Sequence, residues 1–174
     1  MSGVTCRDAD AADAASLASL GRRTFTETFG HLYKPEDLAV FLRNHDEEKW
    51  RDQLGDKDFA IRLAEADGEA VAYVKVGPPS LPFEPRGPSL ELRQLYVLQP
   101  WHGAGIAAEL MDWAIAQARA YGACDLYLSV FVDNHRARRF YDRYGFEQVG
   151  QFHFMVGSHA DDEYVMRLAL RELE

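Results

Sequence analysis

The stretch LELRQLYVLQPWHGAGIAAELMDWAIAQA, residues 90 to 118, holds the pattern that decides the fold. Its alternating apolar residues predict a strand over Leu90–Leu98, which Pro100 ends. Helical spacing then predicts a helix over Gly103–Tyr121, with one buried face made of Ile106, Leu110, Ala114 and Ala118. Between strand and helix lies the glycine loop, residues 102 to 107. This strand–loop–helix unit is the point from which we place the rest of the chain.

The glycine loop allows three interpretations. Small residues let backbone N–H groups approach a ligand, and the start of a helix adds unpaired donors and positive potential, so the loop can hold a phosphate or pyrophosphate. Gly103, Gly105 and Ala108 also satisfy the GxGxxA pattern of dinucleotide-binding folds. Five residues, Leu98 to His102, separate the strand from the first glycine, however, where that fold has a tight turn. The third interpretation is a turn that only packs the helix. A P-loop is excluded because no Gly-Lys-Ser/Thr follows.

A second motif occupies residues 134 to 146, which read NHRARRFYDRYGF. It predicts a helix over Asn134–Tyr144 that Asp133 or Asn134 caps. Four arginines and one aspartate between residues 134 and 143 indicate either a nearby anionic ligand or a solvated helix face. Tyr141 shares a stripe with Ala137 and therefore faces the sheet. It is either a core tyrosine or a positioned phenol able to act as a general acid.

The remaining segments predict one α/β domain over residues 1 to 174. Further strands are expected at Val4–Cys6, Phe59–Leu63, Val71–Val76, Leu126–Val132, Gln151–Val156 and Tyr164–Leu170. One helix follows the aspartates at positions 8 to 13, and a second opens at Pro35 and continues through Asp46–Leu54. Asp67-Gly68 predicts a hairpin turn, and the proline-rich stretch Gly77–Ser89 a stiff loop. The order β-α-α-β-β-β-α-β-α-β-β predicts a mixed, mostly antiparallel sheet with helices on both faces.

Composition excludes several classes of protein. Of 174 residues, 47% are hydrophobic and 27% charged, which is ordinary globular usage. With 19 basic and 28 acidic residues the net charge is −9, which argues against a general nucleic-acid binder. Cys6 and Cys124 make no disulfide framework, and the six histidines show no metal-binding spacing, so no metal is expected. We find no signal peptide and no membrane span, which predicts a cytoplasmic protein.

Together, the two motifs resemble those of the GNAT superfamily of acetyl-CoA-dependent N-acetyltransferases. The family's first motif, Arg/Gln-x-x-Gly-x-Gly/Ala, corresponds to the glycine loop, with His102 where Arg or Gln is usual. The second, Asn-x-x-Ala-x-x-Phe-Tyr-x-x-x-Gly-Phe, is matched in full at residues 134 to 146. The resemblance runs from about Leu90 to Phe146, and the order of elements extends it to nearly the whole chain.

The resemblance implies direct transfer of an acetyl group from acetyl-CoA to an amine, within a ternary complex. A bulge at residues 95 to 97 would free backbone groups for the pantetheine arm, and the glycine loop would hold the pyrophosphate. Asn134 would contact the cofactor, and Tyr141 would protonate the departing thiolate. The cofactor-binding residues expected in this way are Leu95, Tyr96, Val97, His102, Gly103, Ala104, Gly105, Ile106, Ala107, Asn134, Ala137 and Arg138.

The amine must lose a proton before it attacks, and Glu91 is the candidate base or water-positioning residue. Ordinary strand alternation places Glu91 on the same face as Arg93 and Leu95. Many members of the resembled family carry a carboxylate at this position. The other interpretation is a strand glutamate paired with Arg93.

The acceptor remains open between several amines. Residues 25 to 38 and 152 to 166 resemble the bacterial spermidine/spermine acetyltransferase group. A polyamine site needs several carboxylates beside aromatic faces, and the candidates are Glu27, Glu36, Asp37, Asp162 and Glu163. A protein N-terminus, lysine, an aminoglycoside or another small amine is an alternative acceptor. A non-catalytic acyl-CoA sensor and a nicotinamide-dependent enzyme are alternative functions, and a homodimer is expected by analogy with the family.

Overall fold

The computed structural model describes residues 3–43 and 46–171. Its seven strands are β1 (Val4–Asp8), β2 (Ala60–Ala66), β3 (Glu69–Gly77), β4 (Ser89–Val97), β5 (Asp125–Phe131), β6 (Glu147–Val156) and β7 (His159–Ala169). Its α-helices are α1 (Ala14–Phe29), α2 (Pro35–Leu42), α3 (Glu47–Leu54), α4 (Ile106–Tyr121) and α5 (His135–Tyr144).

All seven strands form one sheet in the order β1-β2-β3-β4-β5-β7-β6. Only β4 and β5 run parallel, and every other neighbouring pair is antiparallel. This confirms the mixed, mostly antiparallel sheet. It also removes the dinucleotide-binding alternative, because that fold needs a mostly parallel sheet with its glycine motif in the first strand–helix turn.

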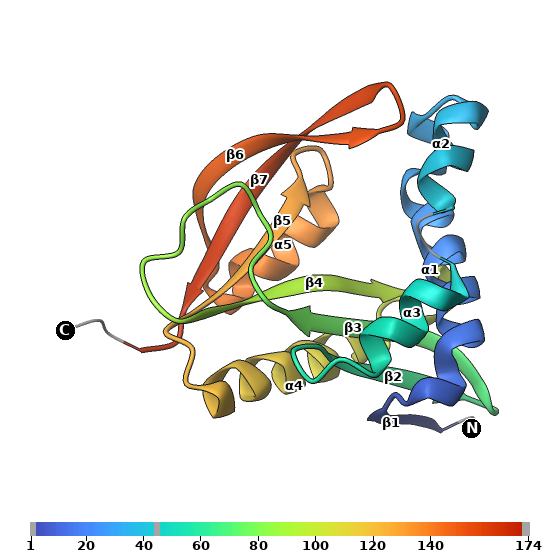
Figure 1. Cartoon of the computed structure of the whole chain (residues 1–174), viewed down its shortest axis with the longest axis horizontal. Coiled ribbons are helices and arrows are strands. Elements are labelled where there is room, and N and C mark those ends of the chain that lie inside the picture. Colours follow the sequence, from blue (N-terminus) through green and yellow to red (C-terminus); the bar gives the residue numbers. More distant parts are fainter. Residues whose placement is uncertain (1–2, 44–45, 172–174) are drawn as a thin grey trace.

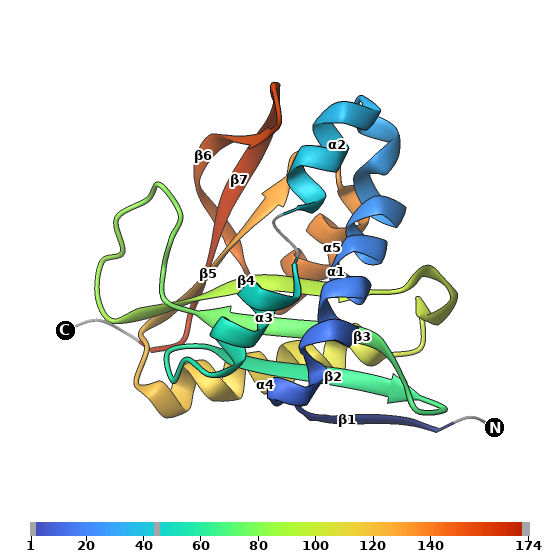
Figure 2. The same cartoon turned by 45° about the vertical axis from the view of Figure 1, so that its right-hand side comes forward.

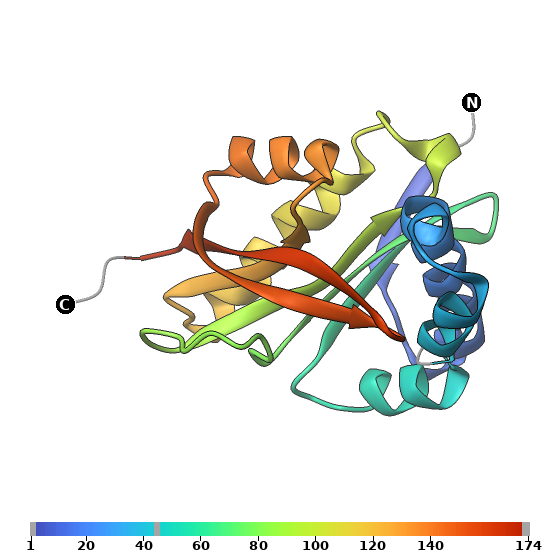
Figure 3. The same ribbon diagram turned by 90° about the horizontal axis from the view of Figure 1, so that it is seen from above.

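Helices cover both faces of the sheet, as the sequence predicted. In Figure 2, α1 and α3 lie in front of the central strands and α4 lies behind them. Seen from above, α4 and α5 lie together on one side, away from α1, α2 and α3 (Figure 3). The predicted inner face of α4 is buried, from Ile106 at 3% exposed to Leu110 and Ala114 at 0%. The core therefore lies where helical periodicity placed it.

Several boundaries differ from the prediction for identifiable reasons. Three helices rather than two separate β1 from β2, because Asp46 caps a new helix by accepting a hydrogen bond from the Lys49 N–H at 2.8 Å. Helix α4 begins at Ile106 rather than Gly103, since Gly103 and Gly105 have φ of 80° and 83° and cannot join a right-handed helix. Strands β6 and β7 also begin four and five residues earlier than predicted, β7 including aspartates that are rare in strands.

A bulge in β4 changes which residues share a face. Lys75 pairs with Gln94 but Val76 pairs with Leu92, so Arg93 is the extra residue. Glu91 pairs with Gly77 on the Lys75 face of β3, whereas Leu95 pairs with Val74 on the opposite face. The bulge lies at Arg93 and not at residues 95 to 97, where it was expected and where β4 pairs with β3 in regular register. The expectation that Glu91 and Leu95 share a face is also wrong, and the cause is the bulge.

Strands β4 and β5 separate soon after they begin. They pair only over Ser89–Glu91 and Asp125–Tyr127, although both continue further. Figure 1 shows β4 and β5 diverging, with α5 on one side of the gap and the β6–β7 hairpin beyond it. This separation opens the sheet at its centre and provides the space for a ligand.

Candidate active site

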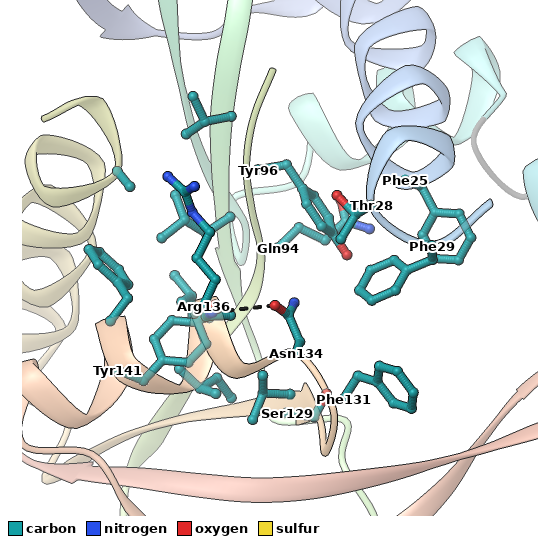
Figure 4. Close-up of a pocket in the computed structure, with 18 of the residues that line it drawn as sticks. Phe25, Thr28, Phe29, Gln94, Tyr96, Ser129, Phe131, Asn134, Arg136 and Tyr141 are labelled. Carbon is teal, nitrogen blue, oxygen red and sulfur yellow. Dashed lines mark hydrogen bonds between the residues drawn. The ribbon is translucent and has the colours of Figure 1, made fainter. Parts of the chain in front are cut away.

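A cavity of about 520 Å³ lies where β4 and β5 separate. It is lined by residues of α1, β4, the glycine loop, β5, α5 and the β6–β7 hairpin. Figure 4 shows Tyr141 and Asn134 across this space from Tyr96 of β4 and the rings of Phe25 and Phe29. Motifs that lie far apart in the sequence therefore meet in one site.

The glycine loop forms one end of the cavity. Gly103 and Gly105 adopt left-handed backbone conformations, and a Cβ on either would contact nothing within 4 Å. Glycine is thus required for the turn itself, which presents backbone N–H groups at the start of α4. The His102 ring contacts the Val97 carbonyl oxygen at 2.7 Å, so this side chain fastens the loop to the end of β4. An anion here would be held mainly by backbone groups and by the positive end of α4.

Tyr141 lies beside the loop and is 9% exposed. Asn134 caps α5 by accepting a hydrogen bond from the Ala137 N–H at 3.3 Å, which fixes the first turn of the helix that carries Tyr141. The ring packs against Phe140 and Phe146. Burial, and next the charge of Glu163, raises the pKa of Tyr141 to about 12. The phenol therefore keeps its proton at neutral pH and can give it only to a base formed during a reaction.

Aromatic rings form the other end of the cavity. Phe25 stacks on Phe41 with ring centroids 4.1 Å apart, and Phe29 meets Phe131 edge-on at 6.2 Å. The Tyr33 hydroxyl donates a hydrogen bond to Asp161 of β7. These contacts join the α1–α2 segment to the β5–β7 side of the cleft, so the site is closed by parts of both halves of the chain.

The charged residues of the cavity are Arg93, Arg136, Arg143 and Glu163. Two of the four arginines of α5, Arg136 and Arg143, line the cavity, and Arg138 and Arg139 do not. Glu163 is the one acidic residue in the described lining. Sequence reasoning named it only as one of five carboxylates that could contribute to a polyamine site.

Glu91 lies outside this cavity and borders a neighbouring one of about 470 Å³ with Lys75, Gln94 and Ser129. Its carboxylate accepts hydrogen bonds from the Ser80 N–H at 2.6 Å and the Ser80 hydroxyl at 3.0 Å. Arg93 Nε lies 3.6 Å from the second oxygen. Burial raises the pKa of Glu91, and the contacts with Ser80 and Arg93 oppose that rise.

Most of the expected cofactor residues line the main cavity. They are Leu95, Tyr96, Val97, His102, Gly103, Gly105, Ile106, Ala107, Asn134 and Ala137. Ala104 lies between the two glycines but is not in the lining. Arg138 instead donates a hydrogen bond to the Val132 carbonyl at 2.8 Å and lies over the Tyr164 ring. Its observed contacts hold the start of α5 in place.

Of the five carboxylates considered for a polyamine, Glu163 alone lines the described cavity. Asp37 accepts hydrogen bonds from the N–H and hydroxyl of Ser158, both at 3.1 Å, and so joins α2 to the β6–β7 turn. Glu27 accepts one from the Gln99 N–H at 3.0 Å, and Asp162 pairs with His153 at 2.8 Å. Glu36 is exposed near the start of α2.

The described residues hold neither a candidate metal site nor a membrane-spanning helix. Within residues 3–43 and 46–171, no cluster of three or more histidine, cysteine, aspartate or glutamate side chains is arranged to bind a metal ion. None of the described helices combines the length and apolar character needed to cross a bilayer. Cys6 and Cys124 are free thiols, and neither lines the cavity.

Comparison with protein families finds the acetyltransferase (GNAT) family, whose sequence profile matches residues 22–146. An uncharacterized N-acetyltransferase of Mycobacterium tuberculosis is 35% identical over 162 residues, which cover 92% of this chain and 98% of that protein. The aminoalkylphosphonate N-acetyltransferase of Salmonella typhimurium is 32% identical over 118 residues, covering 64% of this chain and 75% of that protein.

Among solved structures, the PaiA N-acetyltransferase of Thermoplasma acidophilum in complex with coenzyme A has the same fold. Its TM-score is 0.79 at 19% identity, and the match covers 96% of this chain and 99% of that one. At this level of identity the likeness concerns the fold alone.

Proposed function

The chain belongs to the acetyltransferase (GNAT) family, and from that premise we propose that it transfers the acetyl group of acetyl-CoA directly to a primary amine. The observation that carries this proposal is the single cavity that joins the glycine loop to Tyr141 and to the aromatic end under α1. A pyrophosphate, a reacting thioester and an acceptor need these three environments in this order. One relative, the aminoalkylphosphonate N-acetyltransferase of Salmonella typhimurium, is named for transfer to an amine of this kind.

The residues of the site fit coenzyme A. The glycine loop offers backbone N–H groups at the positive end of α4, where a pyrophosphate can bind without charged side chains. The bulge at Arg93 interrupts the β3–β4 ladder, and beyond it residues 95 to 97 lie along the cavity. Arg136 and Arg143 add positive charge on the α5 side. Ala104 and Arg138 remain proposed cofactor contacts, through the backbone of the loop and the first turn of α5.

When bound, acetyl-CoA supplies the acetyl group as a thioester. Tyr141 holds its proton at Oη and releases it to the sulfur as the C–S bond breaks, which is the general-acid role. The buried ring positions that hydroxyl, since α5 and Phe146 fix it. Glu91, next to the second cavity, stays a candidate for the base or for a residue that orders water.

A polyamine such as spermidine or spermine is the proposed acceptor to test first. The aromatic rings of α1 and the carboxylate of Glu163 fit one ammonium group and its methylenes. The described lining holds this one carboxylate, whereas a polyamine carries more than one ammonium group. A monoamine or a protein N-terminus needs only the one carboxylate, and is the alternative acceptor. A non-catalytic acyl-CoA sensor is the alternative of a different class.

The test measures release of the CoA thiol from acetyl-CoA with spermidine, spermine, lysine, an aminoglycoside, 2-aminoethylphosphonate and a short peptide. Release with polyamines alone supports the full proposal, and release with another amine keeps the enzyme but changes the acceptor. Acetyl-CoA binding without release for any amine would favour the sensor. Tyr141→Phe should lower turnover by about 100-fold with acetyl-CoA affinity unchanged, and unchanged turnover would remove Tyr141 from the mechanism.

Two further parts of the proposal concern the location of the protein in the cell and its oligomeric state. A cytoplasmic location suits an enzyme that uses acetyl-CoA. A homodimer would use the open edge of the sheet at β6, and light scattering of the purified protein measures its mass in solution.

A further inference from the structure

Glu163 is half-buried and differs from the buried carboxylates of the described chain. One of its oxygens, Oε2, is buried and has no hydrogen-bond partner within residues 3–43 and 46–171. The buried carboxylates of Asp13, Asp37, Glu91, Asp125 and Asp161 all have side-chain or backbone donors. A buried, unpartnered carboxylate oxygen is destabilising, so a folded protein keeps one where a ligand, an ion or water supplies the partner, or where the group has a catalytic role.

The position of Glu163 shows what that ligand must contact. On β7 it lies opposite Phe131 of β5 and Phe152 of β6 and shares a strand face with Asp161. It lines the main cavity together with Tyr96 and Tyr141. The acceptor nitrogen must come between the thioester and the aromatic end, which is the part of the cavity that Glu163 borders.

The electrostatic surroundings of Glu163 contain acidic and phenolic groups. Asp161 on β7, Tyr33 after α1, Tyr96 on β4 and Tyr141 on α5 all interact with it or with its charge. Burial, and next Asp161, raises the pKa of Glu163 to about 8. Asp161 already accepts a hydrogen bond from Tyr33 and contacts His159 at 3.0 Å. Although Arg93, Arg136 and Arg143 line the same cavity, none of them is among the groups that shift the pKa of Glu163. An ammonium ion beside this carboxylate would supply the missing positive charge.

We propose that Glu163 binds the ammonium group of the acceptor and accepts its proton, which makes it the catalytic base of the reaction. This assignment rests on the proposed acetyl transfer. It deepens that proposal by defining the acceptor as a cationic primary amine whose nitrogen lies between Glu163 and Tyr141. Glu91 is the less suitable base, because Ser80 and Arg93 already occupy its carboxylate.

The proton balance is complete with these two residues. The ammonium gives one proton to Glu163, and the free amine then forms an N–C bond with the acetyl carbon while the C–S bond breaks. The sulfur leaves with the electron pair and takes the proton of Tyr141. The nitrogen loses its second proton to the Tyr141 phenolate, and Glu163 returns the first to solvent.

The two residues also act on each other. The negative charge of Glu163 is one cause of the raised pKa of Tyr141. When Glu163 takes the amine proton that charge disappears, and the phenol becomes a stronger acid just before the thiolate needs its proton. One event thus prepares both the nucleophile and the acid.

The test compares wild type, Glu163→Gln and Asp142→Asn, using spermidine or, if another amine of the panel reacts faster, that amine. Asp142 is an exposed carboxylate next to Tyr141 in the chain and outside the cavity lining, so its variant controls for the loss of a charge. Glu163→Gln should lower kcat/KM about 100-fold near pH 7.5. The deficit should shrink about tenfold per pH unit toward pH 10, because the amine then loses its proton unaided.

A binding measurement gives a readout independent of turnover. Calorimetric titration of the amine into the CoA-bound protein, in buffers of different ionisation enthalpy, reports proton release. At pH 7 a carboxyl of pKa about 8 is mostly protonated, so binding of the ammonium should release close to one proton from wild type and from Asp142→Asn. Glu163→Gln should release none. Glu163→Asp, which keeps the carboxylate but shortens it, should retain the proton release and lose part of the rate.

Distinct results refute distinct claims. If wild type acetylates no amine of the panel, the proposed function fails and this assignment fails with it. If wild type is active but Glu163→Gln keeps its pH profile and its proton release, only the role of Glu163 is wrong. If Glu91→Gln loses the pH dependence of kcat/KM near pH 8 while Glu163→Gln keeps it, the catalytic base is Glu91 and not Glu163.

Discussion

Lys75 is a buried lysine whose replacement should stabilise the protein. It is 8% exposed, its Nζ lies 2.6 Å from Gln53 Oε1, and it lies over the Trp50 ring with the nitrogen 4.1 Å from the centroid. Burial, and next the charge of Arg93, lowers its pKa from 10.5 to about 7. Lys75→Met keeps the apolar stem and removes the amine. We expect it to reveal how much the buried amine lowers the free energy of unfolding.

The magnitude follows from the pKa difference. At about 1.4 kcal/mol per pKa unit, the drop from 10.5 to about 7 amounts to about 5 kcal/mol. Between these pH values the unfolded chain binds a proton that the folded chain does not, so the stability of wild type rises with pH across that window. Below pH 7 the full cost of the buried charge is present, and near pH 10.5 it has vanished. Loss of the Gln53 contact costs about 1–2 kcal/mol at every pH.

The difference between the two proteins should therefore change sign. By urea unfolding, Lys75→Met should be about 3–4 kcal/mol more stable than wild type at pH 6.5 and about 1–2 kcal/mol less stable at pH 10.5. The exposed Lys57→Met is the matched control and should give a flat difference. If the difference in unfolding free energy between Lys75→Met and wild type stays constant from pH 6.5 to 10.5, the claim that burial lowers the pKa of Lys75 to about 7 is refuted.

Three other perturbations test other parts of the structure. Arg86→Leu removes the charged partner of Asp125, whose side chain is 0% exposed and receives two hydrogen bonds at 2.8 Å; thermal and urea unfolding should show a clear loss of stability at pH 7. Burial favours a higher pKa of Asp125, but Arg86 holds that pKa below the ordinary value of 3.8. The stability lost in Arg86→Leu should therefore shrink as the pH falls below 3.8, because Asp125 is then protonated. Gly105→Ala should cost about 1–2 kcal/mol of stability and weaken CoA binding, whereas Gly122→Ala, at a φ of 89° on the far end of α4, should carry the same strain and leave CoA affinity intact. Asp37→Ala should lower stability by about 1–3 kcal/mol and raise the KM for the amine with CoA affinity unchanged, because Asp37 ties α2 to the turn before β7; an unchanged KM would separate that tie from the acceptor site.

Local signals were enough for much of the fold. The Asp67-Gly68 turn forms with φ of 54° and 81°, as that pair requires, and the inner face of α4 follows the helical period. Asn134, one of the two predicted caps, caps α5, and Tyr141 is buried on the inner side of that helix, where it also lines the cavity. These features depend on residues within a few positions of one another, which is what a single sequence records.

Features that depend on pairing between distant segments were missed. The extra residue at Arg93 is defined by β3, so alternation within β4 alone assigned Glu91 to the wrong face. Glu163 was indistinguishable from its neighbour Asp162 in the sequence, yet one lies in the cavity and the other outside it. Only the register of β7 against β5 separates them. The start of β7 was missed because its aspartates suit an exposed turn better than a strand.

The separation of β4 and β5 explains why one site can hold both the cofactor and a proton route. Because the two strands pair for only three positions, the far end of β4 carries Tyr96 away from Phe131 at the far end of β5. Strand β7 pairs along the whole of β5 and so follows it away from β4, which brings Glu163 level with Phe131 at the open end. Helix α5, which follows β5 directly, places Tyr141 against the same opening. Had β4 and β5 stayed paired, their backbone groups would fill the gap and these two side chains would have no common space. The same break in hydrogen bonding that opens the cavity therefore also places Tyr141, the proposed acid, and Glu163, the proposed base, on one cavity.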